Sequence, residues 1–342
     1  MNLNATETVT VLSTVDLTES QLDRLRAVSP RLEIVQEVDA TFNELPASLS
    51  NRVQILFGQR GPVLGATQYP SLRWVQAQSA GIDYLYDDPI WSSPILITTT
   101  VGIHATPMAE RAMSLILAFQ SQLPMLMALK ARCEWLDTKT GWQLFGNSNE
   151  LRGSTLGIFG YGAVGRELAR QASSLGMVVL ACNRSGQRQL LQGFAEPGKG
   201  DPTAVIPQSI YATAQLNDML SSCDYVVLVA PLTSDTRYLF GAKAYAAMKP
   251  GVYFFNLGRG KLVREIELIE AIQSGRVGGA GLDVFEDEPL PESSPLWKMS
   301  NVIISPHIAG ISNHYNDRAT VLFSENLRRF LADERMINLV ER

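Results

Sequence analysis

Cysteine and histidine are scarce in this sequence. Only three of the 342 residues are cysteine and three are histidine. The cysteines, Cys133, Cys182 and Cys223, are far apart and form no CxxC pair. This spacing argues against a disulfide framework and against a zinc site, so we expect no bound metal. A chain without a disulfide framework fits a reducing compartment, and we expect it in the cytoplasm.

Basic residues are also fewer than acidic ones. The chain has 29 Lys and Arg against 34 Asp and Glu, which gives a net charge of -5. It therefore lacks the basic footprint of a nucleic-acid-binding protein, and we expect no such partner. An anionic substrate would need positive charge placed locally, because the whole molecule does not supply an attractive field.

Long hydrophobic runs are missing as well. The most apolar helical stretch, residues 113–129, is interrupted by Gln120, Ser121, Gln122 and Pro124. It is not expected to span a membrane. The N-terminal end shows no basic region followed by an apolar one, so we expect no signal peptide and no membrane association.

Short apolar runs that alternate with helical stretches are abundant. The alternation predicts parallel α/β sheets, and the chain length predicts roughly two domains. The apolar runs fall at 8–15, 32–38, 53–58, 72–78 and 95–100, and again at 156–160, 177–183, 225–231, 252–258, 280–285 and 302–310.

Residues 106–131 are predicted to form a long helix that is apolar on most faces. Thr106 could cap it, with Pro107 at its first position, and Pro124 should kink or break it. A helix of this kind lies in a core or an interface, and we favour packing of part of it against a second subunit.

A glycine fingerprint follows the run at 156–160 and opens a helical stretch. Gly160 would form the tight turn, Gly162 would let the backbone approach a pyrophosphate, and Gly165 would let helix and sheet pack closely. The free N–H groups of Ala163 and Val164 would face the phosphates at the positive end of the helix. This context predicts a dinucleotide site.

The residues after the next strand favour NADP(H) over NAD(H). NAD-specific sites usually carry an acid there to hold the ribose 2′-hydroxyl. This chain has Asn183, Arg184 and Ser185, which could pair with a 2′-phosphate. The alternative is that Arg184 is a solvated turn residue with no influence on the cofactor.

Three polar side chains at strand ends suggest hydride-transfer chemistry. His307 can deliver a proton, Glu288 can orient and stabilise its imidazolium, and Arg259 can hold a carbonyl and a carboxylate. Asp283 closes a further strand and could lie on the nicotinamide side. Each also has an ordinary explanation: a surface arginine, one of several loop acids beside Glu286 and Asp287, or a hydrogen-bonded structural histidine.

The remaining histidines, His104 and His314, are interpreted as structural or adjacent to substrate.

Together with the motifs given below, these residues make the sequence resemble the D-isomer-specific 2-hydroxyacid dehydrogenase family over nearly its whole length. It is closest in character to the NADP-dependent glyoxylate and hydroxypyruvate reductases. The resemblance is carried by SAGID (79–83), MAERA (108–112), LRGSTLGIFGYGAVG (151–165), APLTSDT (230–236), NLGRG (256–260), AGLDVFEDEP (280–289) and SPHIAG (305–310).

The resemblance implies residue roles. Arg259, Glu288 and His307 fall on the catalytic set, and the backbone of Ala80 and Gly81 would bind the substrate carboxylate together with Arg259 and His307. The cofactor contacts that the resemblance implies are Ala163, Val164, Asn183, Ala230, Pro231, Thr236, Leu257, Gly258 and Asp283. They add to the contacts predicted above for Gly160, Gly162, Gly165, Arg184 and Ser185.

The resemblance also implies an architecture. We expect two Rossmann-like or flavodoxin-like parallel-sheet domains with a cleft between them. Residues 1–103 and 309–342 would form the substrate-binding domain, and residues 104–308 the dinucleotide-binding domain. Relatives of this family are typically homodimers through the long helix.

The implied activity is the NAD(P)H-dependent interconversion of a small 2-oxo acid and its D-2-hydroxy acid. Glu288 argues against formate dehydrogenases, which place Gln there, and Ala80 against phosphite dehydrogenases, which carry lysine. An NAD(P)H-sensing or corepressor-like protein on the same fold remains the alternative. The chain departs from the family pattern at Asn183, at Arg264 and in the long Gly- and Pro-rich segment 186–208, which is predicted as a surface loop.

Overall fold

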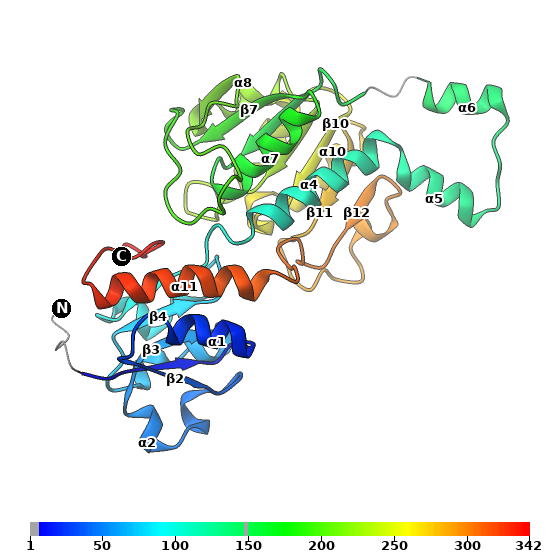
Figure 1. Ribbon diagram of the computed structural model, residues 1–342. Coiled ribbons are helices and arrows are strands. Elements are labelled where there is room, and N and C mark those ends of the chain that lie inside the picture. Colours follow the sequence, from blue (N-terminus) through cyan, green and yellow to red (C-terminus); the bar gives the residue numbers. More distant parts are fainter. Residues whose placement is uncertain (1–6, 147–149) are drawn as a thin grey trace. The chain divides into compact units, whose positions relative to one another are not determined.

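The computed structural model describes residues 7–146 and 150–342, which form two compact units (Figure 1). The first contains Met1–Ile103, Gly193–Glu196 and Ser312–Arg342. The second contains His104–Gln192 and Pro197–Ile311. The short stretch at 193–196 belongs to the first unit although both its neighbours in sequence belong to the second, and no sequence pattern indicated this.

The first unit is built on a five-stranded parallel sheet in the order β2-β1-β3-β4-β5. Its strands are β1 (Val9–Ser13), β2 (Leu32–Gln36), β3 (Val53–Gly58), β4 (Trp74–Ala77) and β5 (Leu96–Thr98). Its helices are α1 (Glu19–Arg26), α2 (Ala47–Ser50), α3 (Arg60–Val63) and α11 (Tyr315–Leu331). Each predicted apolar run of the first hundred residues is a strand.

Helix α11 closes the core of the first unit. Phe323 lies with its ring centroid 4.6 Å from that of Phe57 and 5.3 Å from that of Trp74. The Trp74 indole Nε1 donates to Thr98 Oγ1 at 2.7 Å, so the buried ring keeps its polar atom satisfied. Helix α11 thus completes the hydrophobic core of a unit whose strands all lie within the first hundred residues.

The second unit holds a seven-stranded parallel sheet in the order β12-β11-β10-β9-β6-β7-β8. Its strands are β6 (Thr155–Phe159), β7 (Val178–Asn183), β8 (Ser209–Ala212), β9 (Tyr225–Leu228), β10 (Val252–Asn256), β11 (Val277–Leu282) and β12 (Val302–Ile304). Its helices are α4 (Ala105–Gln120), α5 (Leu123–Ala131), α6 (Thr138–Phe145), α7 (Ala163–Ser174), α8 (Leu216–Leu220), α9 (Ala242–Ala247) and α10 (Glu265–Gln273). The edge strand β8 was not predicted, because only four residues separate the irregular segment from the next helical turn.

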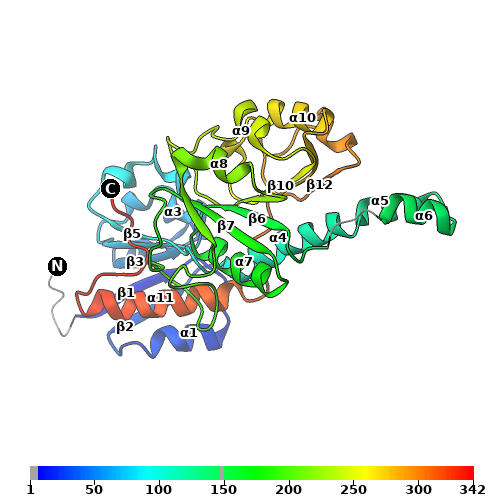
Figure 2. The ribbon, with the colours of Figure 1, turned by 90° about the horizontal axis from the view of Figure 1, so that it is seen from above.

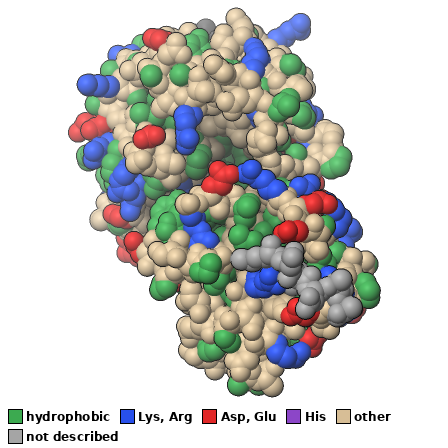
Figure 3. Space-filling model, turned by 90° about the vertical axis from the view of Figure 1, so that its left-hand side faces the viewer, with side chains coloured by type: hydrophobic (Ala, Val, Ile, Leu, Met, Phe, Trp, Pro, Cys, Tyr) green, Lys and Arg blue, Asp and Glu red, His purple; other side chains and the backbone are tan. Residues whose placement is uncertain are grey.

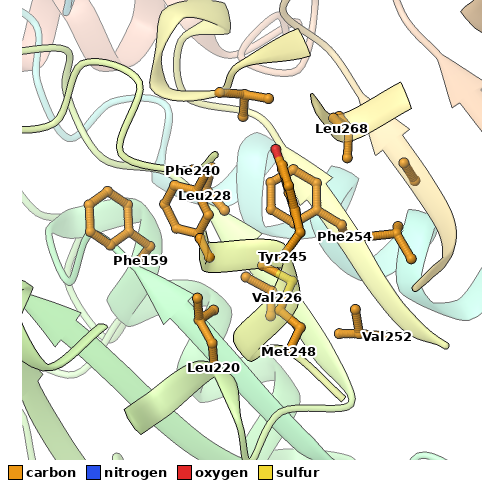
Figure 4. Packing of buried hydrophobic residues seen from close by; sticks show 14 of the residues in the cluster. Phe159, Leu220, Val226, Leu228, Phe240, Tyr245, Met248, Val252, Phe254 and Leu268 are labelled. Carbon is orange, nitrogen blue, oxygen red and sulfur yellow. The ribbon is translucent and has the colours of Figure 1, made fainter. Parts of the chain in front are cut away.

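Aliphatic side chains and several aromatic rings form a hydrophobic cluster on this sheet (Figure 4). Phe240 packs against Phe159 with centroids 5.1 Å apart and against Phe254 with centroids 5.8 Å apart. Full burial of such a ring contributes roughly 1.5–3 kcal/mol. This core holds the carboxyl ends of β6, β9 and β10 in fixed positions, and the candidate site is built on those ends.

The predicted long helix is broken into α4 and α5, which meet at an angle of 64°. Pro124 lies in the first turn of α5, and Gln122 before it has a φ of 53°. Helix α4 begins at Ala105 with His104 at its N-cap, so the expectation that Thr106 caps it was wrong. Among the described residues no single helix is long and apolar enough to cross a membrane; α4 and α5 pass that test only as this bent pair.

Helices α5 and α6 extend away from the rest of the second unit in both ribbon views (Figures 1 and 2). We call this segment, residues 123–145, the arm. It exposes apolar side chains that a monomer would normally bury: Leu123, Leu126, Met127, Trp135, Trp142 and Leu144.

Charged side chains of both signs are interspersed on the face shown in Figure 3. This mixture matches the near balance of 29 basic and 34 acidic residues.

Candidate active site

The glycine fingerprint forms the turn between β6 and α7. Gly160 has a φ of +102°, and a Cβ there would lie 2.6 Å from the Ala230 nitrogen at the end of β9. A Cβ on Gly165 would lie 2.2 Å from the Gly160 oxygen, whereas one on Gly162 would meet nothing within 4 Å. Two glycines therefore permit close packing, and the third leaves open space at the N-terminus of a twelve-residue helix. The turn fits a pyrophosphate bound by first-turn N–H groups.

The residues after β7 form a tight turn around Asn183. Its Oδ1 accepts from the Gly186 N–H at 2.7 Å and the Ser185 N–H at 3.1 Å. The side-chain amide of Asn183 therefore stabilises the turn by accepting these two backbone hydrogen bonds. Arg184 is exposed at the tip, and within residues 7–146 and 150–342 its guanidinium makes no hydrogen bond or ion pair.

Arg188 is different from Arg184. It donates to the backbone carbonyls of Ala204, Pro207 and Gln208 and so fixes the irregular segment 186–208. Of these two arginines, Arg184 is therefore the one exposed to solvent after β7 without a hydrogen-bond partner among the described residues.

The other predicted cofactor residues lie at the ends of the neighbouring strands. Thr236 Oγ1 donates to the Pro231 carbonyl at 2.8 Å and closes the turn after β9. Gly258 packs beneath that turn, where a Cβ would lie 2.9 Å from the Ala230 oxygen. Leu257 is buried. These residues form the wall of the site beside the glycine turn.

His307 and Glu288 are in direct contact. The His307 Nδ1 lies 2.7 Å from Glu288 Oε2. An ionised carboxylate can only accept, so Nδ1 is the donor and Nε2 is left for proton exchange. The Glu288 carboxylate is itself held, because Oε1 accepts from the Phe285 N–H at 3.1 Å. The predicted acid–histidine pair is therefore formed.

The structure distinguishes Glu288 from the acid two residues earlier. Glu286 Oε1 accepts from the Glu265 N–H at 2.6 Å, at the start of α10. The Glu286 carboxylate therefore accepts a hydrogen bond at the N-terminus of α10, where negative charge is favourable.

Asp283 organises the loop that carries His307. The carboxylate is buried and accepts from the N–H groups of Ile308 and Ala309 at 3.0 and 2.9 Å, and from the Ser305 hydroxyl. His307 has a φ of 56°, and its N–H donates to the Asp283 carbonyl at 2.8 Å. Sequence reasoning gave Asp283 a nicotinamide contact and missed this support of the loop, for which Ser305 in SPHIAG was the available signal.

Arg259 follows β10, the strand next to β11. Its turn is fixed by buried Asn256, whose Nδ2 donates to the Arg259 carbonyl at 3.0 Å and whose Oδ1 accepts from the Gly258 N–H at 3.1 Å. The Arg259 Nη1 donates to the Gly258 carbonyl at 2.9 Å. Arg259, Glu288 and His307 thus follow the carboxyl ends of three adjacent strands, the usual place for reactive groups in such sheets.

Ala80 and Gly81 belong to the first unit, in the loop after β4. This glycine loop, residues 78–83, is braced at its start: the Gln78 carbonyl accepts from the Tyr315 hydroxyl at 2.8 Å and from the Thr100 hydroxyl. Burial raises the pKa of Tyr315, which keeps it a neutral donor. Tyr315 and Thr100 were not singled out from sequence.

The other two histidines lie elsewhere. His104 occupies the N-cap position of α4 and packs against Gly310. His314 is exposed, with its Nδ1 3.4 Å from Asp317 Oδ2.

The arrangement in the second unit can carry out proton-coupled hydride transfer. The glycine turn offers a place for a dinucleotide, which would supply the hydride. His307 offers a proton at Nε2, Glu288 orients the imidazole, and Arg259 offers a cation for an anionic substrate.

Comparison with known proteins agrees with this chemistry. Residues 113–309 match the family described as "D-isomer specific 2-hydroxyacid dehydrogenase, NAD binding domain". The chain is 33% identical to a glyoxylate/hydroxypyruvate reductase B of Salmonella typhimurium, over 83% of this chain and 85% of that one.

Two solved structures are similar over nearly the full length. A D-isomer specific 2-hydroxyacid dehydrogenase of Xanthobacter autotrophicus, in complex with NADPH and MES, has a TM-score of 0.79 at 26% identity and covers 98% of each chain. An NADPH-dependent glyoxylate/hydroxypyruvate reductase of Sinorhizobium meliloti, in complex with NADP and sulfate, has a TM-score of 0.76 at 25% identity, again over 98% of each. The sensor alternative finds no support among these relatives. The chain therefore belongs to the D-isomer-specific 2-hydroxyacid dehydrogenase family and is an NAD(P)-dependent oxidoreductase of 2-oxo and 2-hydroxy acids.

Proposed function

We propose that the protein reduces glyoxylate and hydroxypyruvate to their 2-hydroxy acids with NADPH, and that chiral products have the D configuration. The observation that carries the proposal is the 2.7 Å contact between His307 Nδ1 and Glu288 Oε2 beside the strand that bears Arg259. The relatives named above supply the substrate class.

In this proposal each residue has one task. The N–H groups of Ala80 and Gly81 bind the substrate carboxylate, and Arg259 polarises the 2-oxo group. His307, oriented by Glu288, donates a proton from Nε2 to the oxygen as negative charge develops there. The first unit then acts as the substrate-binding domain and the second as the cofactor domain.

The preference for NADPH rests on the turn after β7. It contains no carboxylate that would repel a 2′-phosphate, and Arg184 is exposed there with no partner among the described residues. The two solved relatives named above hold NADPH or NADP.

We also propose that the protein is a cytoplasmic homodimer associated through α4 and the arm. Trp135 is 97% exposed and Trp142 is 73% exposed, which is costly for a lone monomer in water. Three free cysteines, two of them buried, support the proposed cytoplasmic location, because disulfides are rare in that compartment.

The deciding experiment follows absorbance at 340 nm with purified protein, using glyoxylate, hydroxypyruvate and pyruvate, each with NADPH and with NADH. We expect oxidation of NADPH with the first two substrates. A preference for NADH would contradict the proposed preference for NADPH but would still agree with reduction of 2-oxo acids. Tight binding of NADPH without any turnover would contradict the proposed substrates.

A further inference from the structure

Arg60 is an exposed cation that the catalytic assignment leaves unused. It stands two residues after β3, whose last residue, Gly58, pairs with Ala77 at the end of β4. The glycine loop begins directly after Ala77. Arg60 and the glycine loop therefore leave the same edge of the sheet from adjacent strands, where parallel sheets bind ligands.

The Arg60 guanidinium is fixed by an aromatic ring. Its Cζ lies 5.0 Å from the centroid of Tyr84, within the range of a cation–π contact. The Tyr84 hydroxyl in turn lies 3.2 Å from the Ser79 hydroxyl, in the residue before Ala80. A chain of contacts thus ties the position of Arg60 to the backbone proposed to hold the substrate carboxylate.

The donors of Arg60 are open among the residues that the structure describes. Within residues 7–146 and 150–342 its guanidinium makes no hydrogen bond or ion pair. Other arginines of the first unit are committed, for example Arg52 to Glu33 at 2.7 Å and Arg318 to Glu196 at 2.9 Å. An oriented guanidinium with open donors is suited to an oxygen-bearing ligand group.

We propose that Arg60 is a specificity-determining residue that donates hydrogen bonds to an oxygen-bearing substituent on C3 of the 2-oxo acid. The inference rests on the proposed function, because it places the substrate carboxylate on Ala80 and Gly81. C3 is two bonds from the carboxylate carbon, so a C3 hydroxyl or carboxylate projects to within side-chain reach of that loop. Glyoxylate has no C3 and pyruvate has only a methyl group there, so neither engages Arg60.

The test compares substrates within one variant. In Arg60→Met the KM for hydroxypyruvate should rise about tenfold with kcat little changed, since a hydrogen bond from a charged group contributes roughly 1.5–3 kcal/mol. The KM values for glyoxylate and pyruvate should stay within about twofold of wild type. Arg60→Lys keeps the charge without the planar fork and should recover part of the loss.

Arg24→Met serves as the matched control, because Arg24 is an exposed cation on α1, and it should leave all three substrates unchanged. Equal losses for glyoxylate and hydroxypyruvate in Arg60→Met would mean that Arg60 only supports the loop, and would overturn the inference. An unchanged KM for hydroxypyruvate would overturn it as well. Failure of the wild type to turn over any of the substrates would instead remove the proposed function, so the two failures are distinguishable.

Discussion

His307 is held by three features of its surroundings. Glu288 fixes Nδ1, the Asp283 carbonyl accepts the backbone N–H, and the Asp283 carboxylate holds the next two residues. The imidazole is therefore pre-oriented before substrate binds, which is the condition for efficient proton transfer.

Replacing His307 by Ala should lower kcat roughly 10²–10⁴-fold, because the developing alkoxide loses its proton donor. Cofactor binding, followed by fluorescence titration, should stay near normal. His314→Ala is the control: that ring is exposed on the N-cap of α11 beside Asp317 and should leave kcat unchanged. An unaffected rate in His307→Ala would refute its role as the acid.

Arg184 decides the cofactor preference in our proposal. Arg184→Ala should raise the KM for NADPH roughly tenfold, because a pair with the 2′-phosphate is lost. The KM for NADH, which lacks that phosphate, should change by less than twofold and serves as the internal control. A parallel change for both cofactors would show that the turn is merely disturbed.

At the scale of elements, helix α7 is fastened to the irregular segment 186–208 by buried polar groups. Arg166 donates to the carbonyls of Tyr161, Asp201 and Gln189, and the Tyr161 hydroxyl donates to Asp201 Oδ2 at 2.7 Å. On the same helix, buried Glu167 accepts from Arg170, Gln171 and the Gly200 N–H. Segment 186–208 is therefore held in place by hydrogen bonds to α7. It belongs to the second unit, apart from residues 193–196, which belong to the first.

Glu167 should make the stability of the protein depend on pH. Burial by itself would raise its pKa, but the hydrogen bonds from Arg170, Gln171 and Gly200 lower the pKa to about 2. A lowered folded-state pKa contributes stability above the ordinary value near 4.5, and this is lost as pH falls from there toward 2. Glu167→Gln should reduce the free energy of unfolding by roughly 2–3 kcal/mol at pH 7 and by clearly less at pH 3.

Urea unfolding of wild type and variant at the two pH values measures this difference. Glu19→Gln removes one partner of an exposed pair with Arg26 and should leave the free energy of unfolding nearly unchanged at either pH. A difference for Glu167→Gln that stays constant with pH would show that lost packing, not lost charge, causes it.

Much of the element order follows from the sequence, for local reasons. Each apolar run bounded by turn residues became a strand, and Pro124 broke the long helix. The glycine fingerprint and the strand-end positions of Arg259, Glu288 and His307 were readable because they depend on residues close in sequence. Strand β8, the support of His307 by Asp283 and the bracing of Gln78 by Tyr315 were not, because they depend on contacts between segments distant in sequence.

At the scale of the whole molecule, the arm predicts association. Replacing Trp135 and Trp142 together by Asp should convert the proposed dimer to monomers, because both side chains lie in the proposed interface and the new carboxylates would be buried there without a cationic partner. Light scattering after size exclusion measures the mass. Val205→Asp, at an apolar side chain 69% exposed outside the arm, should leave the dimer intact. A wild type that is already monomeric would refute the proposed assembly.

The division of the chain between the units has a consequence for synthesis. The first unit begins at the N-terminus, yet its core needs Phe323 from α11, and Phe194 from the short stretch at 193–196 packs against the same cluster. The second unit has all its residues once Ile311 has been made. The sheet of the first unit is therefore made before the second unit, yet its core is completed only after Ile311, when residues 312–342 supply α11.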